Sequence, residues 1–106
     1  MKSCETIEIS IWIAGDINQA RQVCREFCRE VGFCVTLTEV DYIYTGGEER
    51  GIRVGIINYP KYKSDRDTLF EKAEQLAEML RVRLCQRSYS IMAPDYTVWF
   101  DAEHFG

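Results

Sequence analysis

The chain has 106 residues, a net charge of -4 and a sequence pI near 5.0. Hydrophobic residues make up 46% and charged residues 28%, which is an ordinary globular composition and excludes a disordered or low-complexity chain. The acidic balance argues against a general nucleic-acid-binding surface, because non-specific binding to phosphates needs clustered lysine and arginine.

The amino-terminal segment shows no export or membrane signal. Glu8 and Ser10 interrupt the apolar residues between Ile7 and Ile13, so no continuous apolar stretch forms. The five cysteines are an odd number in a chain without such a signal, which favours reduced thiols. We expect a cytoplasmic protein with one α+β domain over residues 1–106 and flexible tails at 1–5 and 101–106.

The first half of the chain predicts a strand followed by a helix. Isoleucines alternate with other residues from Ile7 to Ile13, a period of two that gives a strand with one apolar face. Asp16 is then the expected N-cap of a helix, whose apolar residues are spaced by three and four as far as Val31. Gly32 suits the left-handed conformation that ends helices.

A long β-hairpin is expected next. Residues 33–44 are rich in β-branched and aromatic side chains, but Glu39 and Asp41 share a side with Phe33, so the strand must project past the core or contain a bulge. Residues 45–51 predict a turn, and a second strand follows from Ile52 to Tyr59.

The last part of the chain predicts a second helix and a final strand. Ser64 is the expected N-cap, with an acidic residue three positions on, and an apolar stripe continues to Leu84. A last strand spans residues 89–100 and is interrupted at Pro94. Two strand-helix-strand halves predict a ferredoxin-like βαββαβ two-layer sandwich, with a four-stranded antiparallel sheet and both helices on one face.

No motif predicts a catalytic group, a metal site or a cofactor. Cys24 and Cys28 lie on the apolar stripe of the first helix, where packing is favoured over metal binding. His104 is the only histidine and lies near the chain end. The Gly46-Gly47 turn precedes a strand rather than a helix, so it does not match a phosphate-binding loop.

The sheet face opposite the helices is the strongest candidate for an interaction surface. Strand parity places aromatic and branched residues there, and such a row predicts a covering partner. The six residues are Trp12, Val40, Tyr42, Tyr44, Ile57 and Tyr59. RNA-binding domains of this topology also carry aromatic residues on this face, but their signature is absent from residues 51–57, and no nucleic-acid partner is expected.

The order of elements and the long hairpin resemble a known protein group. Gly32-Phe33-Cys34-Val35 and the segment from Asp41 to Gly47 are similar to the trimeric signalling and metal-tolerance proteins of the PII and CutA type. The resemblance implies subunits that pack through their sheets and project the hairpin. The histidine-proline-tyrosine stretch expected before the last strand of the metal-tolerance group is missing.

These features predict a non-catalytic interaction or regulatory protein that forms a homodimer or homotrimer through its open sheet face and binds a protein partner. A phage or mobile-element accessory protein fits this description. One alternative is a regulatory domain that holds a small ligand between subunits, and another is a small enzyme with an intersubunit active site. The loops expected to meet a partner or ligand contain Gly15, Asp16, Asn18, Gly46, Gly47, Glu48 and Arg50.

Overall fold

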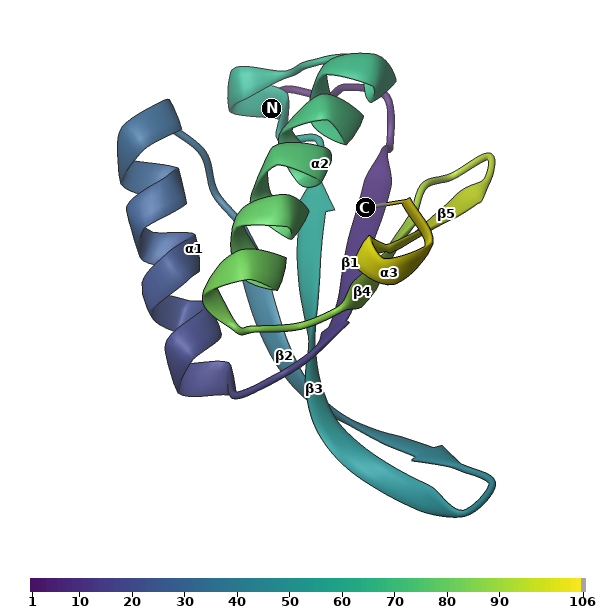
Figure 1. Cartoon of the computed structure of the whole chain (residues 1–106). Coiled ribbons are helices and arrows are strands. Elements are labelled where there is room, and N and C mark those ends of the chain that lie inside the picture. Colours follow the sequence, from purple (N-terminus) through teal and green to yellow (C-terminus); the bar gives the residue numbers. More distant parts are fainter. Residues whose placement is uncertain (106) are drawn as a thin grey trace.

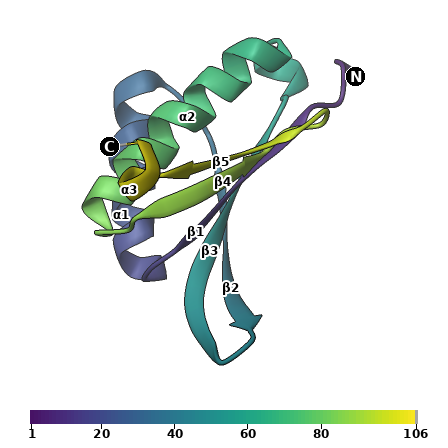
Figure 2. The ribbon, with the colours of Figure 1, turned by 45° about the vertical axis from the view of Figure 1, so that its right-hand side comes forward.

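The computed structural model describes the backbone of residues 1–105 and the side chains of residues 1–103. One antiparallel sheet is covered on one face by two long helices (Figures 1 and 2). In chain order the elements are β1 (Glu8–Ala14), α1 (Ile17–Val31), β2 (Thr36–Tyr44), β3 (Gly47–Ile57), η1 (Pro60–Tyr62), α2 (Arg66–Arg83), β4 (Ser88–Met92), β5 (Thr97–Asp101) and α3 (Ala102–Phe105). The expected α+β sandwich is confirmed.

The sheet has five strands in the order β2-β3-β1-β4-β5, so the prediction of four strands was wrong. The segment expected to be one interrupted strand forms two strands, β4 and β5, which pair with each other. Pro94 lacks a backbone N–H and lies in the connecting turn, which is closed by a hydrogen bond of 2.9 Å from Ala93 N to Tyr96 O. The turn adds β5 to the sheet beside β4.

The β2-β3 hairpin extends far beyond the rest of the sheet (Figure 1). Its two strands pair continuously from Thr36 opposite Gly55 to Tyr44 opposite Gly47, without a bulge. β1 reaches only as far as Gly51 on β3, so the outer half of the hairpin pairs only with itself. Of the two predicted alternatives, projection past the core is therefore the one observed. The predicted turn at 45–51 was too long, because β3 begins at Gly47.

The isoleucine face of β1 forms the centre of the core. Ile9, Ile11 and Ile13 are almost fully buried against α1 and α2, as their alternation predicts. Cys24 is also buried in this core, and burial raises the pKa of its thiol to about 12. A thiol with this pKa stays protonated at neutral pH and packs as a small apolar group.

The helix ends are fixed by short-range hydrogen bonds. The Asp16 carboxylate accepts from Gln19 N at 3.0 Å, which confirms Asp16 as the N-cap of α1. At α2 the N-cap is Asp65 rather than the expected Ser64, because the Asp65 carboxylate accepts from Thr68 N at 2.7 Å. Ser64 N instead donates to the side chain of Asn58.

The segment predicted to be a tail contains secondary structure, since Asp101 ends β5 and α3 follows it. Gly106 lies outside the described residues, and the flexibility of 1–5 and 101–106 stays a prediction. No helix in the described chain is long and apolar enough to cross a membrane.

Candidate active site

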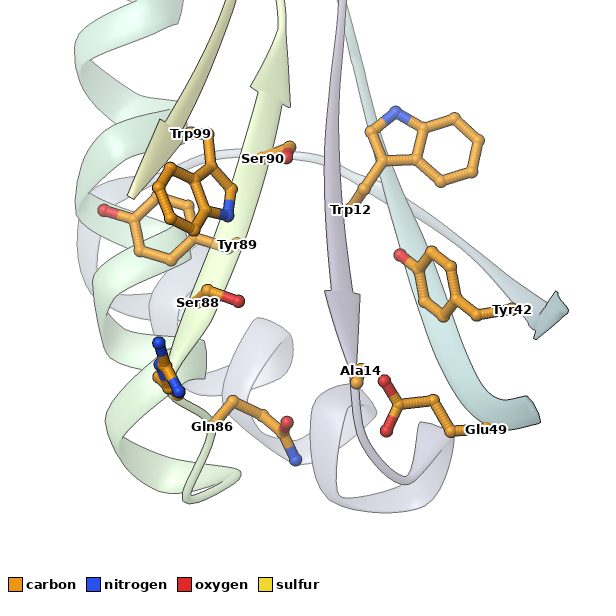
Figure 3. A pocket seen from close by; sticks show the side chains of 10 residues that line it. Trp12, Ala14, Tyr42, Glu49, Gln86, Ser88, Tyr89, Ser90 and Trp99 are labelled. Atoms are coloured by element: carbon orange, nitrogen blue, oxygen red, sulfur yellow. The ribbon is translucent and has the colours of Figure 1, made fainter. Parts of the chain in front are cut away.

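A cavity of about 340 Å³ lies beside the open face of the sheet, where the hairpin bends away from the ends of β1 and β4 (Figure 3). Residues from all five strands and from the α2-β4 connection line it. They are Trp12, Ala14, Tyr42, Glu49, Gln86, Arg87, Ser88, Tyr89, Ser90 and Trp99. We refer to this cavity as the open-face pocket.

Two tryptophans and a serine form one row across the pocket. In the strand register Trp12 on β1 lies opposite Ser90 on β4, and Ser90 lies opposite Trp99 on β5. Residues directly opposite one another point to the same face of a sheet, so the serine hydroxyl lies between two indole rings. On the other side Arg53 follows in the same row, with its guanidinium carbon 5.8 Å from the Trp12 ring centroid. The row therefore presents the apolar faces of two indole rings beside the hydroxyl group of Ser90.

Tyr42 and Glu49 form the hairpin side of the pocket. They lie opposite each other in the β2-β3 register, and both line the cavity (Figure 3). Burial, together with the Glu49 carboxylate, raises the pKa of Tyr42, so its hydroxyl stays protonated at neutral pH and is available as a hydrogen-bond donor. Glu49 makes no ion pair among the described residues. It therefore presents an unneutralised carboxylate at the cavity edge.

The ring of Tyr42 is held flat against the sheet because β3 carries glycine beneath it. A Cβ atom built on Gly51 would collide with Tyr42 Cε2 and would lie only 2.8 Å from Tyr42 Cδ2 and from the carbonyl oxygen of Ile13. No residue with a side chain fits at this position without moving the tyrosine. Gly51 therefore positions Tyr42.

The connection between α2 and β4 supplies the third side of the pocket. Arg87 donates to both carboxylate oxygens of Asp101, at 2.8 and 2.9 Å, and its third nitrogen lies 3.1 Å from Glu103. Asp101 is only 3% exposed, so these two hydrogen bonds hold the α2-β4 connection against β5. Since the charge of Arg87 is already balanced, Glu49 determines the electrostatic character of the cavity.

The pocket is equipped for binding rather than for nucleophilic catalysis. The hydroxyl groups that face it belong to Ser88, Ser90 and Tyr42, and its described lining residues include neither a histidine nor a cysteine. Within residues whose side chains are described, no cluster of three or more metal-ligating groups occurs. Aromatic faces, hydroxyls and one free carboxylate suit a flat heteroaromatic ligand that carries hydrogen-bond donors or positive charge.

Neither a known protein-family model nor a curated protein sequence matches the chain. Two solved structures share its fold. A phage SAM lyase in complex with S-methyl-5'-thioadenosine superposes with a TM-score of 0.73 at 14% identity, over 97% of this chain and 95% of that chain. A phage SAM lyase in the apo state gives a TM-score of 0.70, also at 14% identity, over 92% and 90% of the two chains.

These neighbours overturn the main functional prediction. The sequence predicts a non-catalytic interaction protein, whereas the structures that share this fold along almost its whole length are those of an enzyme. The prediction rested on the absence of a recognisable catalytic motif, and such an absence does not exclude an enzyme.

The residues predicted from the sequence divide between two parts of the molecule. Trp12 and Tyr42 line the open-face pocket, and Val40 and Tyr44 follow on the same face of β2. Ile57 and Tyr59 lie at the far end of β3 and line a separate cleft.

The predicted loop residues do not line the pocket. Gly15 N donates to Arg50 O at 3.1 Å, which joins the β1-α1 loop to the hairpin, while Asp16 and Asn18 bond within α1. Gly46 has a φ of 86° and forms the hairpin turn. Glu48 and Gly47 belong to β3.

Sequence reasoning missed Glu49, Gln86, Ser88, Ser90 and Trp99. Once residues 88–92 and 97–101 are recognised as two strands, the alternation of side chains predicts the side of the sheet to which Ser88, Ser90 and Trp99 point. Glu49 was assigned to a turn, and Gln86 lies in a connection without a pattern, so neither carried a signal.

Proposed function

We propose that the chain is an enzyme that cleaves S-adenosylmethionine and releases S-methyl-5'-thioadenosine from the open-face pocket. The observation that carries the proposal is the shared fold over 97% of the chain with a SAM lyase that holds S-methyl-5'-thioadenosine. The composition of the pocket supports it independently, as the following paragraphs argue.

The pocket chemistry is complementary to an adenosine thioether. An adenine ring stacks favourably on an indole or phenol face, and Trp12, Tyr42 and Trp99 provide such faces on two sides of the cavity. A carboxylate accepts hydrogen bonds from both hydroxyls of a ribose, and Glu49 is the one carboxylate among the described lining residues. We assign Glu49 to the ribose rather than to the sulfonium, because a carboxylate beside the sulfonium would stabilise the substrate more than the transition state, in which that positive charge disappears.

The proposed reaction breaks the bond between the sulfonium sulfur and the γ-carbon of the aminobutyrate chain. The substrate's own carboxylate attacks that carbon, a carbon–oxygen bond forms, and the electron pair of the broken bond goes to sulfur. The products are neutral S-methyl-5'-thioadenosine and homoserine lactone, which balances atoms and charge without water or an added base. Since nucleophile and leaving group belong to one molecule, the protein has to hold a folded substrate conformation and limit access of water.

We also propose that the chain self-associates through its projecting hairpin. Ile43 is 78% exposed and Tyr44 is 56% exposed, and both lie on the hairpin that projects from the domain. The pocket is open to solvent on one side, so the hairpin of a second copy is the segment best suited to close it. Such an arrangement buries apolar side chains and completes a water-poor site.

Turnover in ¹⁸O-labelled water tests the proposed chemistry. Purified protein is incubated with S-adenosylmethionine, and S-methyl-5'-thioadenosine and the four-carbon product are identified by liquid chromatography and mass spectrometry. We expect S-methyl-5'-thioadenosine together with a product whose γ-oxygen is unlabelled, because that oxygen comes from the substrate carboxylate. Later opening of the lactone places label only in the carboxyl group. A labelled γ-hydroxyl would show hydrolysis instead, and no S-methyl-5'-thioadenosine above a protein-free control would refute the function.

A further inference from the structure

A second cleft lies at the opposite end of β3 from the open-face pocket. Its volume is about 600 Å³, within the range of small-molecule sites. It lies between the C-terminal end of α1, the N-terminal part of α2 and the end of β3. Ile57 in this cleft pairs with the first residue of β1, whereas the last residue of β1 lines the open-face pocket. The two cavities are therefore separated by the length of the strand.

The walls of this cleft are mainly apolar. Phe33 and Leu69 belong to the core or pack against it and form the inner part, while Ile57, Tyr59 and Tyr62 contribute ring and branched surface nearer to solvent. The Tyr59 hydroxyl lies 3.6 Å from the thiol of Cys34, which fixes one wall. Such a lining favours the apolar body of a ligand.

The charges of the cleft all have one sign. Lys63 and Lys72 line it, and none of the twelve described residues that line it is acidic, although the whole chain has a net charge of -4. Every ion pair found among the described residues involves an arginine, so neither lysine is neutralised by a neighbouring carboxylate there. Two unpaired ammonium groups beside an apolar wall are complementary to an anion with an apolar body.

We infer that this cleft is a second binding site, distinct from the open-face pocket, for a small amphipathic anion with an aromatic or aliphatic body and a carboxylate, sulfonate or phosphate group. The apolar body contacts Phe33, Ile57 and Leu69, and the anionic group lies between Lys63 and Lys72. The thioether product of the proposed reaction is neutral, so the two cavities select different ligands.

Two dyes of similar shape test the inference. The probe is 8-anilinonaphthalene-1-sulfonate, an aromatic sulfonate whose fluorescence rises in apolar surroundings, and the comparison is the neutral N-phenyl-1-naphthylamine. We expect the folded protein to bind the sulfonate, and the Lys63→Gln/Lys72→Gln double variant to bind it about threefold to tenfold more weakly. Affinity for the neutral dye should be unchanged in that variant, because the apolar walls remain.

Three controls locate the dye. Lys61→Gln removes a nearby lysine that lies over the Tyr62 ring and does not line the cleft, so sulfonate affinity should not change. Cys34→Trp fills the cleft from an exposed position and should abolish binding of both dyes. S-Methyl-5'-thioadenosine should not displace the sulfonate. Equal affinity in the double lysine variant and the native protein, an equal loss in Lys61→Gln, unchanged binding in Cys34→Trp, or displacement by the thioether would each overturn the inference.

Discussion

The ring of Tyr42 on β2 lies directly on the backbone of Gly51, which is two residues beyond its register partner Glu49 on β3. This contact holds the phenol against the sheet and directs its hydroxyl toward the open-face pocket (Figure 3). A glycine at this point of β3 is thus a requirement of the site, although glycine within a strand costs stability.

Gly51→Ala should weaken binding of S-methyl-5'-thioadenosine by about tenfold or more, because the added methyl group displaces Tyr42 and also meets the carbonyl of Ile13. Calorimetric titration measures the affinity, and urea unfolding measures the accompanying loss of stability. The matched control is Gly55→Ala on the same strand, where the methyl group meets only the Thr36 side chain outside the pocket. Equal affinities of the two variants would refute the role given to Gly51.

The buried carboxylate of Asp101 should stabilise the domain through Arg87. Asp101→Ala leaves the guanidinium without its bidentate partner and removes the acceptor for Glu103 N. We expect a loss of about 1–3 kcal/mol in the free energy of unfolding, toward the lower end because the Arg87 side chain is 59% exposed. Urea denaturation measures it. Glu103→Ala, which removes an exposed partner of the same arginine, should cost less than about 1 kcal/mol.

The Arg66–Asp95 pair should make stability depend on acid pH. Arg66 lies 4.6 Å from the centroids of both the Phe70 and Tyr96 rings and donates to Asp95, which lowers the pKa of that carboxyl. A lowered folded-state pKa contributes stability above the unfolded-state value of about 4, and the contribution is lost as the pH falls through the lower folded value. The stability difference between the native protein and Asp95→Asn should therefore be present at pH 6 and shrink below about pH 4.

Asp67→Asn is the control for this pH series. Asp67 lies 3.3 Å from the same guanidinium but is 93% exposed, so its removal should change stability little at any pH. Thermal unfolding of the three proteins between pH 3 and pH 7 provides the comparison. A difference for Asp95→Asn that persists unchanged at pH 3 would exclude the ion pair as its source.

The hairpin tip should govern both self-association and turnover. Ile43→Asn removes an exposed apolar side chain that has no role in the core, so the fold should remain while sedimentation velocity shows smaller species and turnover falls. Val82→Asn changes a comparably exposed residue on α2 and should have neither effect. If the native protein sediments as a monomer and is fully active, the pocket does not need a second copy.

Periodicity explains what could be predicted from the sequence. The isoleucine alternation of β1 fixes both the core face and the outward direction of Trp12, because the side-chain period of a strand is two. The same argument gives the face of Tyr42 on β2. These predictions use only neighbours along the chain.

The remaining site residues depend on pairings between distant segments. Trp99 shares a row with Trp12 only because β4 lies between β1 and β5, an arrangement that no local pattern encodes. Glu49 comes into the pocket because the turn is short and the register places it opposite Tyr42. The glycines and charged residues around Glu49 are as typical of a longer loop as of a short turn. The sequence alone therefore did not distinguish a short turn from a longer loop.

One measurement tests most directly whether the open-face pocket cleaves S-adenosylmethionine. It compares the initial rate of S-methyl-5'-thioadenosine release by the native protein, Glu49→Gln and Glu48→Gln. Glu49 lines the open-face pocket, whereas Glu48 is its neighbour on β3 and lies opposite the exposed Ile43, outside the lining. We predict measurable turnover by the native protein, a rate lower by about tenfold or more for Glu49→Gln, and a nearly native rate for Glu48→Gln. Turnover that is absent from the native protein, or equal in all three, would contradict cleavage of S-adenosylmethionine in this pocket.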